Sequence, residues 1–350
     1  MGKIVIADIC STSDANKSTG HYFSVAQNFV DMFSQSYDVR VAGGPIYNQK
    51  FSSCLIALPY NHNAGESKWS EKFHELANCR TLSKRVGDDD ILIMQSIALV
   101  TAFVGVLLFF HKPCKLFFIQ YNTECISSPL KRLLWKMVSP KVCGIIGTFP
   151  TVAQAYGKPY IIIPDYVYAQ RNSVSFSTYD EREYDVCFVG NIYKDKGVIE
   201  ALQYLKGKGL KIIVAGKIGE PDIEHKLKSI ASADSGIVLR IGFLTTDEYN
   251  EVLANSKYCI LNYRGRYNEH SSGVVYDALF HGTPVLASAT ASTQMVKDYA
   301  LGISFTNLSE IDMTKLSDAN FYAKCQERIV KYLTQQREII GQLSHFIHQA

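Results

Sequence analysis

The feature that most constrains this chain is a regular alternation of short apolar runs with helical patterns. Near-continuous apolar runs, which we interpret as strands, lie at 4–9, 39–42, 91–94, 116–120, 144–146 and 160–163, and then at 185–189, 211–215, 237–241, 258–262 and 284–287. Strands that are apolar throughout and separated by helices are typical of parallel sheets covered on both faces. The sequence therefore predicts an α/β fold with doubly wound sheets.

Helical spacing of apolar residues supports this interpretation. From Tyr22 to Phe33 the apolar side chains recur on one helical face. In the second half, helices are expected near 197–206, 246–256, 273–281 and 292–300. Thr245 and Glu248 have the spacing of a capping box, which predicts the start of the second of these helices.

The length of 350 residues suits two domains better than one core. Residues 164–183 are polar and aromatic with few aliphatic side chains, as expected of an interdomain linker. We predict an N-terminal Rossmann-like domain over 1–165, a second over 166–315, and charged C-terminal helices over 316–350 that pack back across both domains. Ligands of such sheets bind outside the carboxyl ends of the strands, so a central cleft between the two domains is expected.

Charge and cysteine content exclude several classes of protein. The formal net charge is +3 and there is no long Lys/Arg block, so nucleic acid is not expected as a partner. The nine cysteines are scattered singly, several of them in apolar runs, which indicates buried thiols in a reducing compartment and neither a disulfide framework nor a zinc site. The first residues look like a buried strand and not a signal peptide, so a cytoplasmic location is expected.

One segment is apolar enough to span a membrane. Residues 91–110 are interrupted only by Gln95, Ser96 and Thr101. The acidic run at 88–90 before this segment suggests a loop that leads into a buried strand. Ser96 then caps a helix running to about His111. We favour this strand and helix over the transmembrane alternative.

The densest functional signal lies at 267–288, YNEHSSGVVYDALFHGTPVLAS. It predicts a loop, a helix that begins near Ser272, and a strand. Ser271, Ser272 and Gly273 lie where backbone N–H groups have no intrahelical partner and where the helix dipole is positive. Such a helix start suits an anion, a diphosphate in particular.

Two carboxylates flank this helix start, Glu269 before it and Asp277 in its second turn. Their spacing, with Gly282 and Pro284 in register, resembles the E-x7-E motif of retaining GT-B glycosyltransferases of family 4, the glycosyl transferases group 1. The resemblance implies that Glu269 contacts the donor sugar near its reacting carbon and that Asp277 holds the nucleotide ribose. Asp277 departs from the second Glu of the motif by one methylene. The alternative is an ordinary helix with surface acids.

A second loop, at 189–197, is similar to the family's Val-Gly-Arg loop that ends in Lys-Gly. The resemblance implies that Lys196 neutralises the donor diphosphate and acts in catalysis. Asn191 stands where the family has Arg, so one cation is missing. Arg264 or Arg266 is a candidate replacement, although each also fits a solvated surface position.

In the first half, Gly20 and His21 open the first helix, where the family often has a Gly-rich loop that touches donor phosphate or acceptor. Gly20 is a donor-binding candidate. His21 is an acceptor candidate or a plain helix-start residue. Relatives carry a His at the end of a middle strand, and here that place falls at 120–122, so Tyr121 and Glu124 become acceptor candidates.

No cofactor or metal is expected. The run at 88–90 resembles the metal-binding D-x-D of the other glycosyltransferase fold, GT-A, but a loop entering a strand explains it better. His and Cys do not cluster at the spacing of metal ligands, and no G-x-G-x-x-G follows the first strand.

The resemblance implies a GT-B enzyme that transfers a sugar with retention from a UDP- or GDP-type nucleotide sugar to a glycan or lipid-linked hydroxyl. A nucleotide-sugar 2-epimerase of the same fold and an inactive nucleotide-sugar-binding subunit are the alternatives. The segment 131–138, KRLLWKMV, predicts a basic amphipathic helix that docks on an anionic membrane surface, which would make the enzyme peripheral on the inner face. The alternative is that Leu133, Leu134 and Met137 face the core.

Overall fold

The structure is a computed structural model, and it describes residues 2–12, 20–63, 65–95, 100–111, 114–164, 176–268 and 272–349. Its contacts divide the chain into two compact units. Unit 1 comprises Met1–Gln170 and Arg337–Ala350, and unit 2 comprises Arg171–Gln336. Residues 337–350 therefore belong to the first unit and 316–336 to the second, whereas the sequence predicts separate C-terminal helices over 316–350 that pack back across both domains.

Unit 1 is built on a parallel sheet with strand order β3-β2-β1-β4-β5-β6-β7. Its strands are β1 (Ile4–Ala7), β2 (Val39–Gly43), β3 (Leu55–Ala57), β4 (Ile91–Met94), β5 (Lys115–Gln120), β6 (Val142–Gly147) and β7 (Tyr160–Ile162). Its helices are α1 (Gly20–Phe33), α2 (Asn48–Phe51), α3 (Lys68–Arg85), α4 (Val100–Phe109), α5 (Pro129–Val138) and α6 (Pro150–Ala155). The predicted doubly wound α/β architecture is confirmed for this unit.

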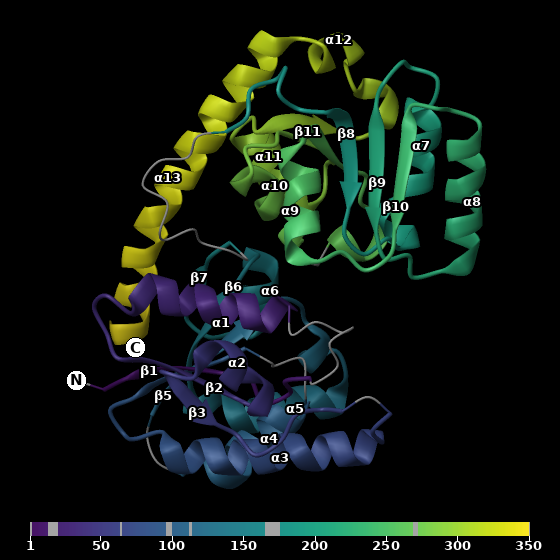
Figure 1. Ribbon diagram of the computed structural model, residues 1–350. Helices are drawn as coiled ribbons and strands as arrows, with labels where there is room; N and C mark the ends of the chain where they lie inside the picture. The colour runs from purple at the N-terminus through teal and green to yellow at the C-terminus, as the bar shows by residue number, and fades with distance from the viewer. Residues whose placement is uncertain are drawn as a thin grey trace. The chain divides into compact units, whose positions relative to one another are not determined.

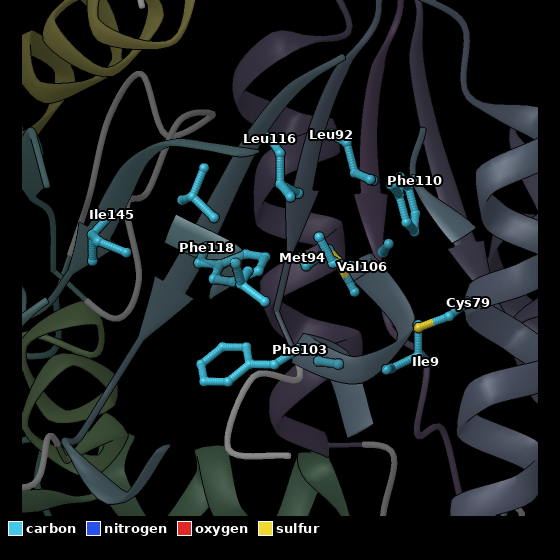
Figure 2. Packing of buried hydrophobic residues seen from close by; sticks show 14 of the residues in the cluster. Ile9, Cys79, Leu92, Met94, Phe103, Val106, Phe110, Leu116, Phe118 and Ile145 are labelled. Atoms are coloured by element: carbon cyan, nitrogen blue, oxygen red, sulfur yellow. The ribbon is translucent and has the colours of Figure 1, made fainter. Parts of the chain in front are cut away.

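Helices cover both faces of this sheet (Figure 1). On one face α1 packs through Val25, Ala26 and Phe29 against the strands. On the other face α3, α4, α5 and α6 contribute to the second core cluster. Figure 2 shows Phe103 and Val106 of α4 among side chains of β4 and β5.

The apolar segment at 91–110 forms the strand β4 and the helix α4. Ser96, the predicted cap, lies outside the described residues, and α4 ends at Phe109. Gly105 lies against Cys79 of α3, where a side-chain carbon would clash with the sulfur. This close approach packs α4 against α3, and the buried residues of α4 are Thr101, Ala102, Phe103, Gly105 and Val106. Among the described residues, no helix is long and apolar enough to cross a membrane.

Unit 2 has a second parallel sheet, with strand order β10-β9-β8-β11-β12-β13. Its strands are β8 (Tyr184–Val189), β9 (Ile212–Gly216), β10 (Ile237–Ile241), β11 (Ser256–Leu261), β12 (Val285–Ser288) and β13 (Gly302–Phe305). Its helices are α7 (Val198–Leu205), α8 (Pro221–Ser232), α9 (Thr246–Ala254), α10 (Gly273–Phe280), α11 (Gln294–Asp298), α12 (Met313–Leu316) and the first part of α13 (Ala319–Gln349). Thr245 and Glu248 form the predicted capping box at the start of α9.

A buried arginine ties several elements of unit 2 together. The Arg182 guanidinium is 4% exposed and donates to the carbonyls of Leu253, Ser256, His281 and Gly282 and to the Thr283 hydroxyl. These acceptors lie at the end of α9, in β11 and in the turn between α10 and β12. The arginine thus fixes the carboxyl end of α10 against the strand beside it.

The long helix α13 contributes to the cores of both units. Tyr322 packs with the second sheet, and Leu343 and Ile347 pack with the first. Within unit 1, Ser344 also hydrogen-bonds Tyr37, with 2.9 Å between the hydroxyl oxygens.

The cysteines agree with the sequence interpretation. All nine are free thiols. The fully buried ones are Cys79, Cys125, Cys187, Cys259 and Cys325.

Candidate functional site

The carboxyl edge of the second sheet has a topological switch point between β8 and β11. From β8 the chain continues to β9 on one side, and β11 lies on the other. Ligands of open parallel sheets bind at such points. The segments that follow these two strands, 190–197 and 262–272, are the ones that carry the sequence motifs. The fold therefore places the described residues of both motifs at the position where a ligand is expected.

Glycines in the loop after β8 and at the end of β9 let the backbone of this loop lie very close to the segments beside it. Gly190 has a φ of +92° and Gly216 a φ of +140°, and a side-chain carbon on Gly216 would clash with the Gly190 carbonyl. Further along, Gly197 has a φ of +57° and lies against Asn262. Glycine is needed at these positions because other residues rarely adopt such backbone angles.

The segment after β11 holds this loop in place. The Asn262 amide donates to the Gly197 carbonyl at 2.9 Å, and the Arg264 backbone N–H donates to the Asp195 carbonyl at 2.9 Å. Lys196 lies between these two bonds and is 9% exposed. The backbone on either side of Lys196 is therefore held in place.

Three side chains converge at Gly190. A side-chain carbon added to Gly190 would lie 3.8 Å from Lys196 Nζ and 3.7 Å from both Tyr249 Cε2 and Val274 Cγ2. Val274 is the second residue of α10. The Lys196 ammonium, the Gly190 backbone and the amino-terminal turn of α10 therefore surround one point, and this arrangement suits an anionic group.

The start of α10 is fixed by hydrogen bonds. Ser272 is the residue before the helix, and its hydroxyl lies 2.7 Å from the Tyr263 hydroxyl. It is buried, while Gly273 is exposed. The prediction that the helix begins near Ser272 is confirmed, and the first turn of α10 lies at the carboxyl edge of the sheet.

Asp277 is joined to a residue that the sequence interpretation did not single out. The Tyr249 hydroxyl in α9 donates to Asp277 Oδ2 at 2.8 Å. Burial, with the nearby Asp277 carboxylate, raises the pKa of Tyr249 well above its ordinary value. The phenol therefore stays protonated and holds one carboxylate oxygen. Nothing in the sequence reveals the pair, because the two residues are 28 positions apart and on different helices.

The residues that could supply the missing positive charge are less well placed than Lys196 to contact a phosphate. Asn191 is exposed. The Arg264 guanidinium lies 3.0 Å from Glu200, and both side chains are about half exposed. For Arg266, the structure describes the backbone and not the side chain. Arg264 would have to leave Glu200 to contact a phosphate near Lys196.

Some of the predicted site residues lie outside the described structure. These are Glu269 and Ser271. Gly20 and His21 are the first two residues of α1, at the carboxyl edge of the first sheet, and the His21 side chain is not described. In the same unit, Tyr121 follows β5 and is half-buried, while Glu124 is exposed in a short 3-10 turn at Glu124–Ile126.

The acidic run at 88–90 lies at the opposite edge of the first sheet. Asp90 accepts from the backbone N–H groups of Gly87 and Lys3 and pairs with the Lys3 ammonium at 3.1 Å. These bonds, together outweighing the effect of its burial, lower the pKa of Asp90. In the part of the chain that the structure describes, no group of three or more His, Cys, Asp or Glu side chains is arranged to hold a metal ion.

Residues 183–315 match the family of glycosyl transferases group 1. The group 1 match begins just before β8 and ends after β13, so it contains the whole second sheet and both motif segments. A search of curated proteins finds no match.

Solved structures show the same fold over the whole chain. Anabaena HepE in complex with UDP and glucose is 13% identical, with a TM-score of 0.69 over 100% of both chains. An E. coli protein described as trehalose-6-phosphate bound with UDP-2-fluoro glucose is 9% identical, with a TM-score of 0.67 over 99% of both chains. TarM is 16% identical, with a TM-score of 0.58 over 78% of this chain, which spans 58% of TarM.

These matches confirm two predictions. The chain resembles the glycosyl transferases group 1, and its two parallel sheets have the GT-B type of fold. At these identities the solved structures establish the fold alone. The roles of Glu269, Lys196, Asp277 and the other site residues stay predictions.

Proposed function

We propose that the protein is a retaining glycosyltransferase that moves a sugar from a UDP- or GDP-type nucleotide sugar to a hydroxyl acceptor. The observation that carries the proposal is the convergence of Lys196 and the start of α10 on Gly190, within the region that matches the group 1 family. HepE in complex with UDP and glucose has the same fold, which favours UDP over GDP.

The site explains how the diphosphate leaves. The bond from the sugar carbon to the phosphate oxygen breaks while the acceptor oxygen forms a bond to that carbon from the same face. Negative charge grows on the leaving phosphate, where Lys196 and the amides at 271–273 stabilise it. The leaving phosphate oxygen accepts the proton of the acceptor hydroxyl, so no separate general base is required.

Lys196 offers a sharp test because Lys194 lies in the same 3-10 turn and is exposed. Lys196→Ala should lower transfer by at least about 100-fold, the usual cost of losing a contact to developing charge. Lys194→Ala is the matched control and should stay near the wild-type rate. Equal activity of the two variants would refute this assignment of the phosphate site.

Reaction products distinguish the alternatives. A transferase needs an acceptor for fast turnover and slowly hydrolyses its donor without one. A 2-epimerase would convert UDP-N-acetylglucosamine to its 2-epimer without any acceptor, and an inactive subunit would bind the donor and leave it unchanged. Product analysis by NMR after incubation with UDP-sugars and GDP-sugars tells the three apart.

We further propose that the reaction needs no metal, because Lys196 and the helix start supply positive charge at the phosphate. Turnover should survive EDTA. Loss of activity on chelation, with recovery on adding manganese, would contradict this.

The proposed setting is the inner face of a membrane, with a glycan or lipid-linked acceptor in surface polysaccharide or glycolipid synthesis. On α5, the exposed fractions of Leu130, Leu133 and Met137 are 67%, 55% and 54%, and Arg132 and Lys136 beside them are exposed. This combination favours an anionic bilayer. Trp135 makes no part of this surface, since it is buried and donates to the Tyr156 carbonyl at 3.0 Å.

Sedimentation with phosphatidylglycerol vesicles tests this surface. Binding should weaken with salt and be lost in Arg132→Glu/Lys136→Glu. The control is Arg80→Glu/Lys84→Glu, which makes the same charge change on exposed residues of α3. Absence of wild-type binding at low salt would exclude the membrane setting.

A further inference from the structure

A cavity of about 420 Å³ lies between the ends of α3 and α4 in unit 1. Its walls come from the last turns of both helices, from the residues just after them and from Cys114, which precedes β5. These segments lead into β4 and β5, so the cavity is at the amino edge of the first sheet, where the strands begin. Substrates of parallel sheets are expected at the carboxyl edge. The cavity is therefore separate from the positions expected for the sugar substrates.

The packing of α4 on α3 explains where the cavity opens. Gly105 lies against Cys79 of α3, where a side-chain carbon would be 2.5 Å from the sulfur. The two helices can come this close because glycine has no side chain. About one turn further along, Ser83 of α3 and Leu108 of α4 line the cavity. The helices thus touch at Gly105 and leave a space at their ends.

The wall of the cavity is largely apolar. Val86 and Phe110 are each 6% exposed, and Phe109 is half-buried. Leu108 also lines the cavity and is 53% exposed, so part of its side chain is left in water. A ligand that covers these side chains would remove apolar surface from water, which is favourable. Because Val86 and Phe110 are recessed, the cavity suits an inserted chain better than a flat bilayer surface.

Cations border this apolar wall. Arg80, Lys84 and His111 line the cavity and are exposed. In the described part of the chain, no Asp or Glu lines it, and none forms an ion pair with Arg80 or Lys84. Both side chains are long enough to reach a group at the mouth of the cavity. They can therefore bind an anion there.

The helix ends do not oppose such an anion. The last carbonyls of a helix carry partial negative charge, which would repel it. The Lys141 ammonium donates to the Phe110 carbonyl at 2.7 Å and to the Val106 carbonyl at 3.4 Å. At the end of α3, the Lys3 ammonium donates to the Arg85 carbonyl at 3.2 Å. These two lysines balance the negative helix ends, so the cations that line the cavity are not needed for it.

We propose that this cavity binds a single apolar chain that ends in a carboxylate, as in a free fatty acid. The chain lies against Val86, Leu108 and Phe110, and the carboxylate accepts from Arg80 and Lys84. The volume is in the lower part of the range for small-molecule sites, roughly 300–1,000 Å³, which suits one chain and not a lipid with two. The tests below need no sugar substrate, so their outcome does not depend on the transferase function.

Isothermal titration calorimetry with dodecanoate, below its critical micelle concentration, tests the ligand class. We expect one dodecanoate per chain, and about tenfold weaker binding of decanoate because two fewer methylenes are buried. Acetate lacks the chain and dodecyltrimethylammonium reverses the charge, so each should bind at least about tenfold more weakly than dodecanoate. Binding that is independent of chain length, or equal binding of the cationic amphiphile, would contradict the proposal.

Substitutions locate the bound chain. Arg80→Gln/Lys84→Gln should weaken dodecanoate binding by about tenfold or more, and Leu108→Glu should do the same because it places an acid beside the carboxylate. All three residues are exposed, so the melting temperatures should stay close to that of the wild type. The matched control, Arg132→Gln/Lys136→Gln, removes two charges from α5 and should bind dodecanoate normally. Loss of binding in the α5 pair, or normal binding in the α3 pair, would overturn the proposal.

Cys114 gives a second readout within the cavity. Its thiol is half-buried and lines the cavity, whereas Cys54 is a half-buried thiol of the same unit that does not. Dodecanoate at ten times its dissociation constant should slow the labelling of Cys114 by N-ethylmaleimide about tenfold, because the occupied fraction is protected. Labelling of Cys54 should not change, and mass spectrometry measures both rates. An unchanged rate at Cys114, or equal slowing at both thiols, would show that the chain does not enter this cavity.

Discussion

The Tyr249–Asp277 pair gives a physical reason for the shortened second acid of the motif. An Asp side chain reaches one methylene less far than a Glu and has fewer rotamers. With Oδ2 held by the Tyr249 hydroxyl at 2.8 Å, the other oxygen has a fixed direction. We therefore propose that Tyr249 is a positioning residue for Asp277.

This predicts a specific pattern of rescue. Tyr249→Phe should raise the KM for the donor about tenfold, because the carboxylate loses its orientation, and should change kcat little. Combining Tyr249→Phe with Asp277→Glu should restore much of the donor affinity, because the longer Glu side chain depends less on the hydrogen bond from Tyr249. Steady-state kinetics of the two variants and the double variant check this.

Two results would contradict it. Unchanged donor KM in Tyr249→Phe would show that the pair is not functional. A double variant worse than either single one would show that the longer acid does not fit.

The motif acid Glu269 leads to a different expectation. Glu269→Ala should lower transfer by at least about 100-fold, as for the loss of a transition-state contact. Asp277→Ala should weaken nucleotide binding more than turnover. Parallel measurement of kcat and of UDP affinity separates the two roles, and near-normal turnover in Glu269→Ala would overturn the motif assignment.

At the scale of elements, the inner strands were predicted correctly because they are buried on both faces and are therefore apolar without interruption. The inner strand β4 matches its predicted bounds, and so does the edge strand β10, whose residues are apolar except for Arg240 although most of them are partly exposed. The edge strand β13 and the short β3 were missed, since neither is an uninterrupted apolar run of strand length. The helix α8 was also missed, although Ile223, Leu227 and Ile230 lie on its buried face at helical spacing.

Arg182 could not be predicted from the sequence. It lies in the polar stretch 164–183, and its partners are mostly backbone carbonyls. Because every residue type has a backbone carbonyl, these partners cannot be recognised in the sequence. Burial lowers the pKa of its guanidinium, so the bonds must offset a desolvation cost. A charged residue in a polar stretch is normally solvated.

Arg182→Leu should destabilise unit 2 by about 3 kcal/mol or more, because it leaves several buried carbonyls unpaired. Arg182→Lys should recover little, since an ammonium lacks the planar fork of donors. Arg328→Leu is the control, as Arg328 is an exposed arginine of the same unit. Thermal unfolding with and without UDP measures the effect, and a wild-type melting temperature in Arg182→Leu would show that the network is dispensable.

At the scale of the whole molecule, the buried thiols make the free energy of unfolding fall as the pH rises above about 9. Burial raises the pKa of Cys79 and Cys125 to about 12 and that of Cys114 and Cys325 to about 11, from an ordinary value of 9.0. Above about pH 9 the unfolded chain loses these protons while the folded chain keeps them. The folded state therefore loses about 1.4 kcal/mol per pH unit for each thiol, up to its folded pKa.

The melting temperature should accordingly fall between pH about 9 and about 11, and Cys79→Ala should fall less steeply than the wild type. Native thiols at these positions should also react slowly with a thiol reagent at neutral pH. A melting temperature that is constant over this interval would contradict the assigned pKa shifts.

The helix α13 has a consequence for the order in which the molecule can be completed during synthesis. Leu343 and Ile347 are fully buried in a core whose other members come from the first 163 residues. The ribosome makes these two residues after every strand of both sheets. Unit 2 can therefore complete its fold before unit 1, although most of unit 1 is synthesised earlier. Until Leu343 and Ile347 are made, part of the face of the first sheet on which α1 packs stays uncovered. A nascent chain arrested after Gln336, where unit 2 ends, should bind a chaperone through that face and release it once the last turns of α13 emerge.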